Sequence, residues 1–475
     1  MTWRVVIVSL VLIASLGIAQ AQESARPLEP AEVLASSEIH FPRILQSLAQ
    51  RSAAEGDALA ALGAFDLVFG ADGFSRVSGF WDGSVVTGMA SQRFRNNGGG
   101  VYAGYRLSDG EFPIYEDQYF TNSGGELTVG VLFSLLRDRQ IDSDRFGIRD
   151  TELTVLEADQ DVLLTKIGVQ RRAIGAYWQW VTMGRKLAVY RNLLEIAELR
   201  ESGLEEQVRR GARAEIFLVE NSQNLVRRRS LVAAAERDFE VAANDLAFFY
   251  RDGDGLPRLP GADRLPPFDN ERLTVPPRME MAAATDALLK RPELARLRAT
   301  IQRVQNRLSL AENALKPRLD LNVEVDHDFG GVAEGGISRD STDTKVGFTF
   351  SVPLQMRSGR GQVYAAESEL GALRLEQRLL QDEIEIEVRN ILASLNGAER
   401  LLMLASEQVG LARRMEEAEQ RRFDSGASDF FLVNIREETA ANAEIEFHRA
   451  RLDRELALAD YQAATVDLNR LGIRE

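Results

Sequence analysis

The stretch PRLDLNVEVDHDFGG, residues 317–331, alternates apolar and polar residues with a period of two. Its apolar positions are Leu319, Leu321, Val323 and Val325. Between them lie Asp320, Asn322, Glu324 and Asp326. This period predicts a β-strand with one apolar face and one strongly acidic face. Two environments fit such a strand: a half-buried position in a soluble sheet, or a position with lipid on one side and water on the other.

Three further stretches carry strand signals. TKVGFTFSVPL, residues 344–354, places Val346, Phe348, Phe350 and Val352 on one face, and Lys345, Gly347, Thr349 and Ser351 on the other. FDLVFGAD, residues 65–72, and ELTVGVLFSLL, residues 126–136, repeat the arrangement in the first half of the chain. The 53 residues 73–125 separate this first pair, and we expect longer strands or an extracellular loop there. The four stretches predict two β-hairpins.

The overall composition excludes several classes of protein. The chain has 475 residues, a formal net charge of −15 and no cysteine. An acidic chain is a poor candidate for nucleic-acid binding, and the lack of cysteine excludes thiolate metal sites, thiol catalysis and a lipidated N-terminal cysteine. His327 in the sequence DHDF is a weak metal candidate, and a polar loop tip is the preferred interpretation. No nucleotide-binding, zinc-protease or nucleophile-elbow motif occurs, so we predict no enzyme, cofactor or metal.

The N-terminus resembles a secretory signal. One positive charge in MTWR precedes the apolar run VVIVSLVLIASLGIA, and AQA at residues 19–21 is a small-residue cleavage site. This pattern predicts a signal peptide over residues 1–21, removed after Ala21, in preference to an uncleaved anchor helix. No later apolar run reaches the roughly 20 residues that a transmembrane helix needs. An exported chain of this kind would enter a membrane only as strands.

The two halves of the chain repeat one order of elements: helix, strand, hairpin, strand, long helix, glycine turn and return helix. The first repeat is predicted over residues 22–250, with its β-hairpin at about 65–136. The second is predicted over residues 291–475, with its β-hairpin at 318–354. Between them, residues 251–290 contain six of the 13 prolines, which predicts an irregular linker.

The long helices show a seven-residue rhythm. Residues in the second half follow one another at spacings of four and three: Ile384, Val388, Ile391, Leu395, Ala398, Leu402, Ala405, Val409 and Ala412. This is a coiled-coil seam. A helix over residues 361–424 would be roughly 95 Å long at 1.5 Å per residue. Such a length suits a rod or a wall of parallel helices, and it exceeds what a globular domain needs.

The turns at the far end of these helices also repeat. QVRRGARAEIFLVEN, residues 207–221, and RRFDSGASDFFLVN, residues 421–434, each place a glycine after basic residues. Gly211 and Gly426 are predicted to cap a helix with positive φ. Glu215 and Asp429 are predicted at the start of the next helix, where negative charge is favourable.

Four strands cannot close a barrel, and lipid does not tolerate an open sheet edge. If the strands face lipid, three chains would combine into a twelve-stranded barrel. The lipid-facing candidates are then Leu319, Leu321, Val323, Val325, Val346, Phe348, Phe350 and Val352. The lumen candidates are Asp320, Asn322, Glu324, Asp326, Lys345 and Thr349. Acidic lumen residues predict a mild preference for cations.

The order of these elements resembles the TolC-like outer membrane efflux protein family over roughly residues 32–472. The motifs that carry the resemblance are RPELARL, AENALKPRLDLNV, VGFTFSVPL, SGRGQVYAAESEL, RRFDSGASDFFLVN and ALADYQAATVDLNRLG. The resemblance implies a mainly α-helical protein with a transmembrane β part. A homotrimer would form a twelve-stranded barrel in the outer membrane, continued by a twelve-helix coiled-coil tube in the periplasm. Such a duct belongs to tripartite efflux or type I secretion systems.

The resemblance also implies partners and a gate at the helix tips. A periplasmic adaptor protein would contact the tips, coupled to an inner-membrane pump of the RND, ABC or MFS type. The tip candidates are Arg210, Gly211, Glu215, Arg421, Arg422, Asp424, Gly426, Asp429 and Asn434. Family members often carry aspartates about two turns after the second tip glycine, whereas this chain has Leu432, Val433, Asn434 and Ile435 there. Asp424 and Asp429 are the nearest carboxylates, and Asn434 and Glu437 are the alternatives for an inward-facing position.

The resemblance leaves one alternative function, a periplasmic coiled-coil scaffold or adaptor without a pore. It would explain the heptads and the export signal, but it gives the alternating strands no role. The expected location is the outer membrane, reached without a lipid anchor. The substrate, the pump and the resting state of the gate do not follow from the residues.

Overall fold

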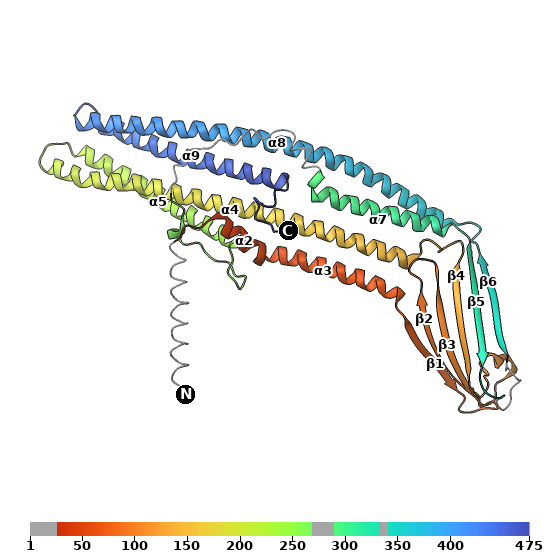
Figure 1. The fold of residues 1–475 in the computed structure, drawn as a ribbon. Helices are drawn as coiled ribbons and strands as arrows, with labels where there is room; N and C mark the ends of the chain where they lie inside the picture. The colour runs from red at the N-terminus through yellow and green to blue at the C-terminus, as the bar shows by residue number, and fades with distance from the viewer. Residues whose placement is uncertain (1–25, 268–288, 333–340, 475) are drawn as a thin grey trace, which may run out of the picture. The chain divides into compact units, whose positions relative to one another are not determined.

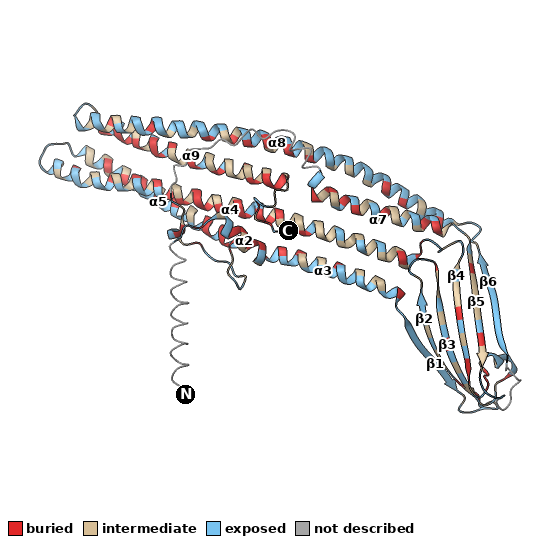
Figure 2. Cartoon of the chain, viewed as in Figure 1, coloured by how far each residue is buried: buried red, intermediate tan, exposed pale blue. Residues whose placement is uncertain are grey.

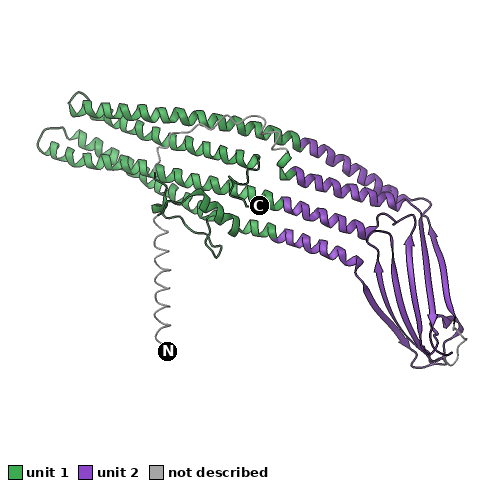
Figure 3. Ribbon diagram, in the orientation of Figure 1, with its two compact units in different colours: residues 1–48, 161–293, 380–475 green, residues 49–160, 294–379 purple. Residues whose placement is uncertain are grey.

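A computed structural model describes residues 26–267, 289–332 and 341–474 of the chain (Figure 1). Three parts of the predictions lie outside these residues. They are the signal peptide, residues 268–288 of the proline-rich linker, and residues 333–340 of the hairpin predicted at 318–354. Contacts divide the chain into two compact units (Figure 3). Unit 1 comprises residues 1–48, 161–293 and 380–475, and unit 2 comprises residues 49–160 and 294–379.

Unit 2 contains one antiparallel sheet with the strand order β1-β2-β3-β4-β5-β6. The strands are β1 (Val68–Ser75), β2 (Ser84–Arg93), β3 (Gly99–Asp109), β4 (Glu126–Ser134), β5 (Arg318–Asp328) and β6 (Thr342–Ser351). The prediction of four strands per chain is therefore wrong: the described residues form six. Between the first two predicted strands, where we expected longer strands or an extracellular loop, the structure has an inserted hairpin, β2–β3.

The missed strands have a weak sequence pattern. In β2 the apolar Val85 and Val86 are adjacent, and Gly88 interrupts the strand, so that no alternation stands out. Glycine also lowers the strand propensity of β3, at Gly99, Gly100 and Gly104. Once β3 is known, Val101, Ala103, Tyr105 and Leu107 show a period of two that was available in the sequence.

The register of the sheet gives it two chemically different faces. Val323 of β5 lies opposite Val131 of β4 and Val346 of β6. One residue along, Glu324 lies opposite Gly130 and Lys345. Because the side chains alternate between faces, the predicted apolar set and the predicted polar set of β5 and β6 fall on opposite faces, as expected. Val352 was predicted to belong to this strand but lies outside it, because β6 ends at Ser351. Pro353 cannot donate a ladder hydrogen bond, so the strand does not continue.

Unit 2 also contains helical segments that lead into and out of the sheet. They are α3 (Pro42–Leu62) from residue 49 on, α7 (Pro292–Ala314) from residue 294 on, and parts of α4 (Ser143–Arg209) and α8 (Arg357–Asp424). Arg303 of α7 donates to Asp150 at 2.9 Å and to Glu157 at 2.8 Å, both on α4. The 3-10 helices of this unit are η1 (Gly63–Phe65) and η2 (Ile114–Tyr119). Pro292 stands in the first turn of α7 and Pro317 follows its end, as predicted.

Unit 1 is built from the remainder of α3, α4 and α8 together with α2 (Pro30–His40), α5 (Ile216–Phe249) and α9 (Phe430–Ala464). No proline occurs after Pro353 or between Pro113 and Pro257, so the long helices run without a break. The predicted seam is confirmed by burial, with Ile384, Val388, Leu395 and Leu402 all buried. The largest core cluster includes Trp180 of α4, which stacks on Phe239 of α5.

The first residues of the linker are irregular, as predicted. Residues 251–267 contain the short helix η3 (Ala262–Arg264) and an isolated bridge between Arg251 and Pro257. Arg264 donates to both carboxylate oxygens of Glu32, at 3.1 and 2.7 Å, and its Nη1 contacts the hydroxyl of Tyr250. Within unit 1, this bidentate ion pair therefore ties the segment to the start of α2.

Candidate functional site

The apolar face of the sheet is exposed in the single chain. Phe348 is 79% exposed, and Val346 and Phe350 are also exposed (Figure 2). The same face continues over β3 and β4 through Val101, Tyr105, Leu127, Val129 and Phe133, all of them exposed. A contiguous exposed apolar surface of this kind marks a region that contacts another protein or lipid.

The opposite face places its carboxylates beside donors. Asp320 is only 4% exposed and pairs with Arg318. Lys345 Nζ lies 2.8 Å from Asp326 Oδ2 and 3.6 Å from Glu324 Oε1. The sequence predicts hydrated carboxylates that set the charge of a pore. The structure brings them together on one face, and each of the three has a cationic partner that offsets part of its charge.

The inserted strand β3 adds one residue to this acidic row that sequence reasoning missed. The hydroxyl of Tyr102 donates to Glu324 Oε2 at 2.6 Å and contacts Asn322 Oδ1 at 3.3 Å. Its ring crosses β4 at Gly130, where an added Cβ would lie 2.1 Å from the ring carbon Cζ. Glycine at this position is therefore required for β3 to reach β5 across the strand between them.

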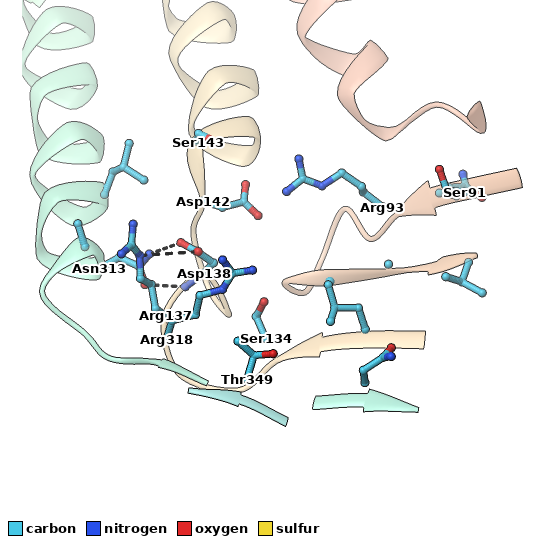
Figure 4. Close-up of a pocket in the computed structure, with 18 of the residues that line it drawn as sticks. Ser91, Arg93, Ser134, Arg137, Asp138, Asp142, Ser143, Asn313, Arg318 and Thr349 are labelled. Carbon is cyan, nitrogen blue, oxygen red and sulfur yellow. Dashed lines mark hydrogen bonds and ion pairs between the residues drawn. The ribbon is translucent and has the colours of Figure 1, made fainter. Parts of the chain in front are cut away.

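A cavity of about 770 Å³ lies in unit 2, where the polar face of the sheet meets its helices (Figure 4). Two of the predicted lumen residues, Asn322 and Thr349, line it. Asp138 adopts a φ of 65° at its margin, and Asn313 holds it by accepting from its backbone N–H at 3.1 Å and donating to its carboxylate at 2.9 Å. The lining of the cavity mixes charged and polar residues with apolar ones such as Leu132 and Leu310.

His327 does not lie at a loop tip. It is part of β5, where Nδ1 is 3.0 Å from Thr342 Oγ1 and the ring packs edge-on against Phe329. The strand simply extends further than the alternating stretch indicated. Among the described residues, no group of three His, Cys, Asp or Glu side chains is arranged to hold a metal ion.

The two tip glycines have the predicted conformation. Gly211 has a φ of +70°; its N–H donates to the carbonyl of Val208 at 2.9 Å, and that of Ala212 donates to Gln207 at 2.8 Å. Gly426 has a φ of +77° and repeats the pattern, with Gly426 to Phe423 at 2.9 Å and Ala427 to Arg422 at 2.8 Å. This pair of bonds is a Schellman motif, so both helices end in the same way.

The other tip candidates lie around these turns. Asp429 caps α9, because its carboxylate accepts from the N–H of Leu432 at 2.8 Å. Glu215 precedes α5 without a side-chain capping bond. Arg210 pairs with Glu206, Arg422 with Glu419, and Asp424 accepts from Gln420. Arg421 is exposed. Their role in contacting a partner stays a prediction.

Asn434 belongs to a buried polar network that joins the two helical hairpins, hereafter the hairpin clamp (Arg200, Arg228, Asn434 and Glu437). Arg228 of α5 donates to Glu437 Oε2 of α9 at 2.8 Å. Arg200 of α4 contacts the same carboxylate and lies 3.1 Å from Asn434 Oδ1. Arg228 is 1% exposed and Glu437 is 4% exposed. Burial lowers the pKa of Arg228, and Glu437 opposes that shift.

The sequence gives only an indirect signal of this clamp. The sequence indicates Asn434 and Glu437 only as alternatives for an inward-facing position near the tip. Their partners, Arg200 and Arg228, come from helices that are distant in the sequence. Nearby on α8, burial raises the pKa of Glu416, and the charge of Glu437 raises it further. Charged side chains therefore concentrate a few helical turns from the tips. The other residues of the seam are apolar or have small side chains.

His448 of α9 makes the stability of unit 1 dependent on pH. Burial lowers its pKa to about 4, with Arg185, Arg451 and Arg413 acting in the same direction and Glu444 against it. An unfolded histidine titrates near 6.5. Below that pH the unfolded chain takes up a proton that the folded chain does not, so stability falls as the pH falls. We expect a loss of about 2 kcal/mol between pH 7.5 and 5.

Thermal unfolding of the detergent-solubilised protein at these two pH values measures this effect. His448→Leu should remove that part of the decrease, whereas His40→Gln should retain it. An equal pH dependence in the wild type and His448→Leu would contradict the assignment to His448.

No helix within the described ranges is both long and apolar enough to cross a membrane. The sheet has an exposed apolar face and an opposite face of paired charges.

Comparison with known proteins gives a family match for the second part of the chain. Residues 283–471 match the family model described as outer membrane efflux protein, so this part of the chain is an outer membrane efflux protein domain. Over residues 283–471, this match agrees with the family predicted from the sequence. Members of this family are non-enzymatic outer membrane efflux channels. This agrees with the predicted function and with the prediction that the chain is not an enzyme. The alternative of a scaffold without a pore is not supported.

Solved structures extend the fold over nearly the whole chain. A membrane protein from Pseudomonas aeruginosa is 14% identical with a TM-score of 0.65, over 93% of this chain and 91% of that one. The Campylobacter jejuni CmeC outer membrane channel is 13% identical with a TM-score of 0.63, over 93% and 88%. The Vibrio cholerae outer membrane protein VceC is 13% identical with a TM-score of 0.62, over 92% and 95%. No curated protein matches the sequence.

Proposed function

We propose that three copies of this chain form the exit duct of a tripartite efflux or type I secretion system. The sheets would cross the outer membrane with their apolar faces in lipid, and the helical hairpins would extend into the periplasm. The single observation that carries the proposal is the inverted exposure of the sheet: Phe348 is exposed and Asp320 is buried. In a soluble sheet the apolar face would be the covered one.

The helix tips are the proposed contact for a periplasmic adaptor protein. Both end in a Schellman turn with a glycine, beside exposed basic residues such as Arg210 and Arg421. The adaptor would couple the duct to an inner-membrane pump of the RND, ABC or MFS type. Opening would require the two hairpins to separate near the tips, and the hairpin clamp opposes that separation. The precursor would be exported by a signal peptide over residues 1–21 that is cleaved, and no lipid anchor is involved.

Ion selectivity in planar lipid bilayers tests whether the polar face lines a pore. Changing Asp320, Glu324 and Asp326 together to their amides should shift the permeability ratio of K⁺ to Cl⁻ away from cations. Because Lys345 offsets two of these carboxylates, Lys345→Met should shift the ratio in the opposite direction.

The two variants act as controls for each other, since both alter the same row of residues. Conductance steps whose selectivity is the same in the wild type and in both variants would show that these residues do not line the pore. Protein that is inserted in the bilayer but gives no steps would contradict the proposed channel.

A further inference from the structure

The strand count points to a wider barrel than four strands per chain would build. We propose that the chain contributes six strands to a barrel of eighteen, closed by pairing β1 of each copy with β6 of the next. This inference rests on the proposed three-copy duct. It concerns the surface through which copies of this chain recognise one another and the size of the exit.

The hairpin β2–β3 is part of the wall of the sheet. β2 pairs with β1 from Ser84 to Ser91, and β3 pairs with β4 from Gly99 to Arg106. The apolar face continues through it, because Ala103 of β3 lies opposite Val129 of β4 and Ala90 of β2. A hairpin folded as a plug or an external loop would share neither the ladder nor the alternation of faces.

The polar face is also continuous across the inserted strands. The ring of Tyr102 passes over Gly130 and its hydroxyl reaches Glu324, so β3 and β5 are tied together across β4. Arg106 of β3 lies 3.5 Å from Glu126 of β4 on the same face. The acidic row of β5 therefore has one hydrogen-bond partner, Tyr102, on the inserted strands.

The outer edges of β1 and β6 are the surfaces available for another copy. Among the described residues, no strand pairs with the far side of β1 or of β6, and every residue of both strands is exposed. Unpaired backbone groups are not tolerated in lipid, so each edge needs a partner strand. Since the number of strands is even, β6 runs opposite to β1, and β1 of a second copy extends the antiparallel ladder without a break.

The diameter of a barrel grows roughly in proportion to its number of strands, so eighteen strands give about one and a half times the diameter of twelve. The cross-section of the exit is then about twice as large. Barrels of 16–18 strands leave an open aqueous channel unless something fills them. The outer end of this duct would admit larger solutes than a twelve-stranded exit.

Cysteine cross-linking in native outer membranes tests the closure. The chain has no cysteine of its own, so engineered pairs report without background. Ala71→Cys on β1 is combined in turn with Thr344→Cys, Val346→Cys or Phe348→Cys on β6, which share its face. At least one pair should give a covalent ladder that stops at three chains. Ala71→Cys with Ala103→Cys, on an interior strand, should give none.

Electron cryo-microscopy of the wild-type protein in lipid nanodiscs counts the strands directly and needs no variant. Eighteen strands with β1 beside β6 of the neighbouring copy would support the proposal. A barrel of twelve, whether from two copies or from three with β2–β3 outside the wall, would overturn it and leave the channel function in place. A particle without a barrel would overturn both, and so would cross-linking confined to single chains.

Discussion

Replacing Glu437 by leucine is expected to destabilise the helical hairpins by about 3–5 kcal/mol, the usual cost of breaking a buried ion pair. Arg228 would remain buried without its carboxylate partner, and Arg200 would lose the same partner. The unfolding temperature of the detergent-solubilised protein, followed by helical circular dichroism, measures the loss. Tryptic cleavage near the tips should increase in parallel.

Two further variants distinguish the clamp from a general effect of removing a charge. Glu438, the next residue, pairs with Arg227 on the surface, and Glu438→Gln should cost less than about 1 kcal/mol. The double variant Glu437→Leu with Arg228→Leu should recover much of the stability, because no fully buried charge is left unpaired. Equal losses at Glu437 and Glu438 would mean that the buried network does not hold the hairpins together.

The second large effect is expected at Phe348. An arginine on the lipid face of a barrel costs about 2–4 kcal/mol near the middle of the bilayer, and Phe348→Arg also removes an apolar side chain from that face. Every copy in the assembly would carry the change. We therefore expect the variant to be nearly absent from the outer membrane fraction and to accumulate in the periplasm, as measured by immunoblotting.

The neighbouring position provides the control. Gly347 lies on the opposite face of β6, and a Cβ added there meets no atom within 4 Å. Gly347→Arg should therefore reach the outer membrane at close to the wild-type level. If both arginines were tolerated equally, the apolar face of β6 would not contact lipid.

The helices and the second hairpin could be predicted because local rules decide them. A heptad seam, a proline-free stretch and a glycine at the end of a helix act within a few residues of sequence. Gly211 and Gly426 accordingly have the predicted positive φ. In β5 and β6 the alternation is strict, so the strands and the division of their faces followed from the sequence.

Strand β2 and the clamp could not be predicted because they depend on distant residues, whereas the alternation in β3 was present in the sequence but was missed. Gly130 of β4 is explained only by packing between strands, because it makes room for Tyr102 of β3. Nothing near Glu437 in the sequence indicates that Arg200 and Arg228 face it. The carboxylates of β5 were predicted on the correct face, yet their pairing with Lys345 required the register of β6.

The molar mass of the mature protein, determined by light scattering after extraction from outer membranes, tests the central claim most directly. The account predicts a particle that is released only by detergent and contains three chains, each slightly below the 52.8 kDa of the full sequence. A monomer or dimer released without detergent would contradict it, because the apolar face of the sheet would then never contact lipid.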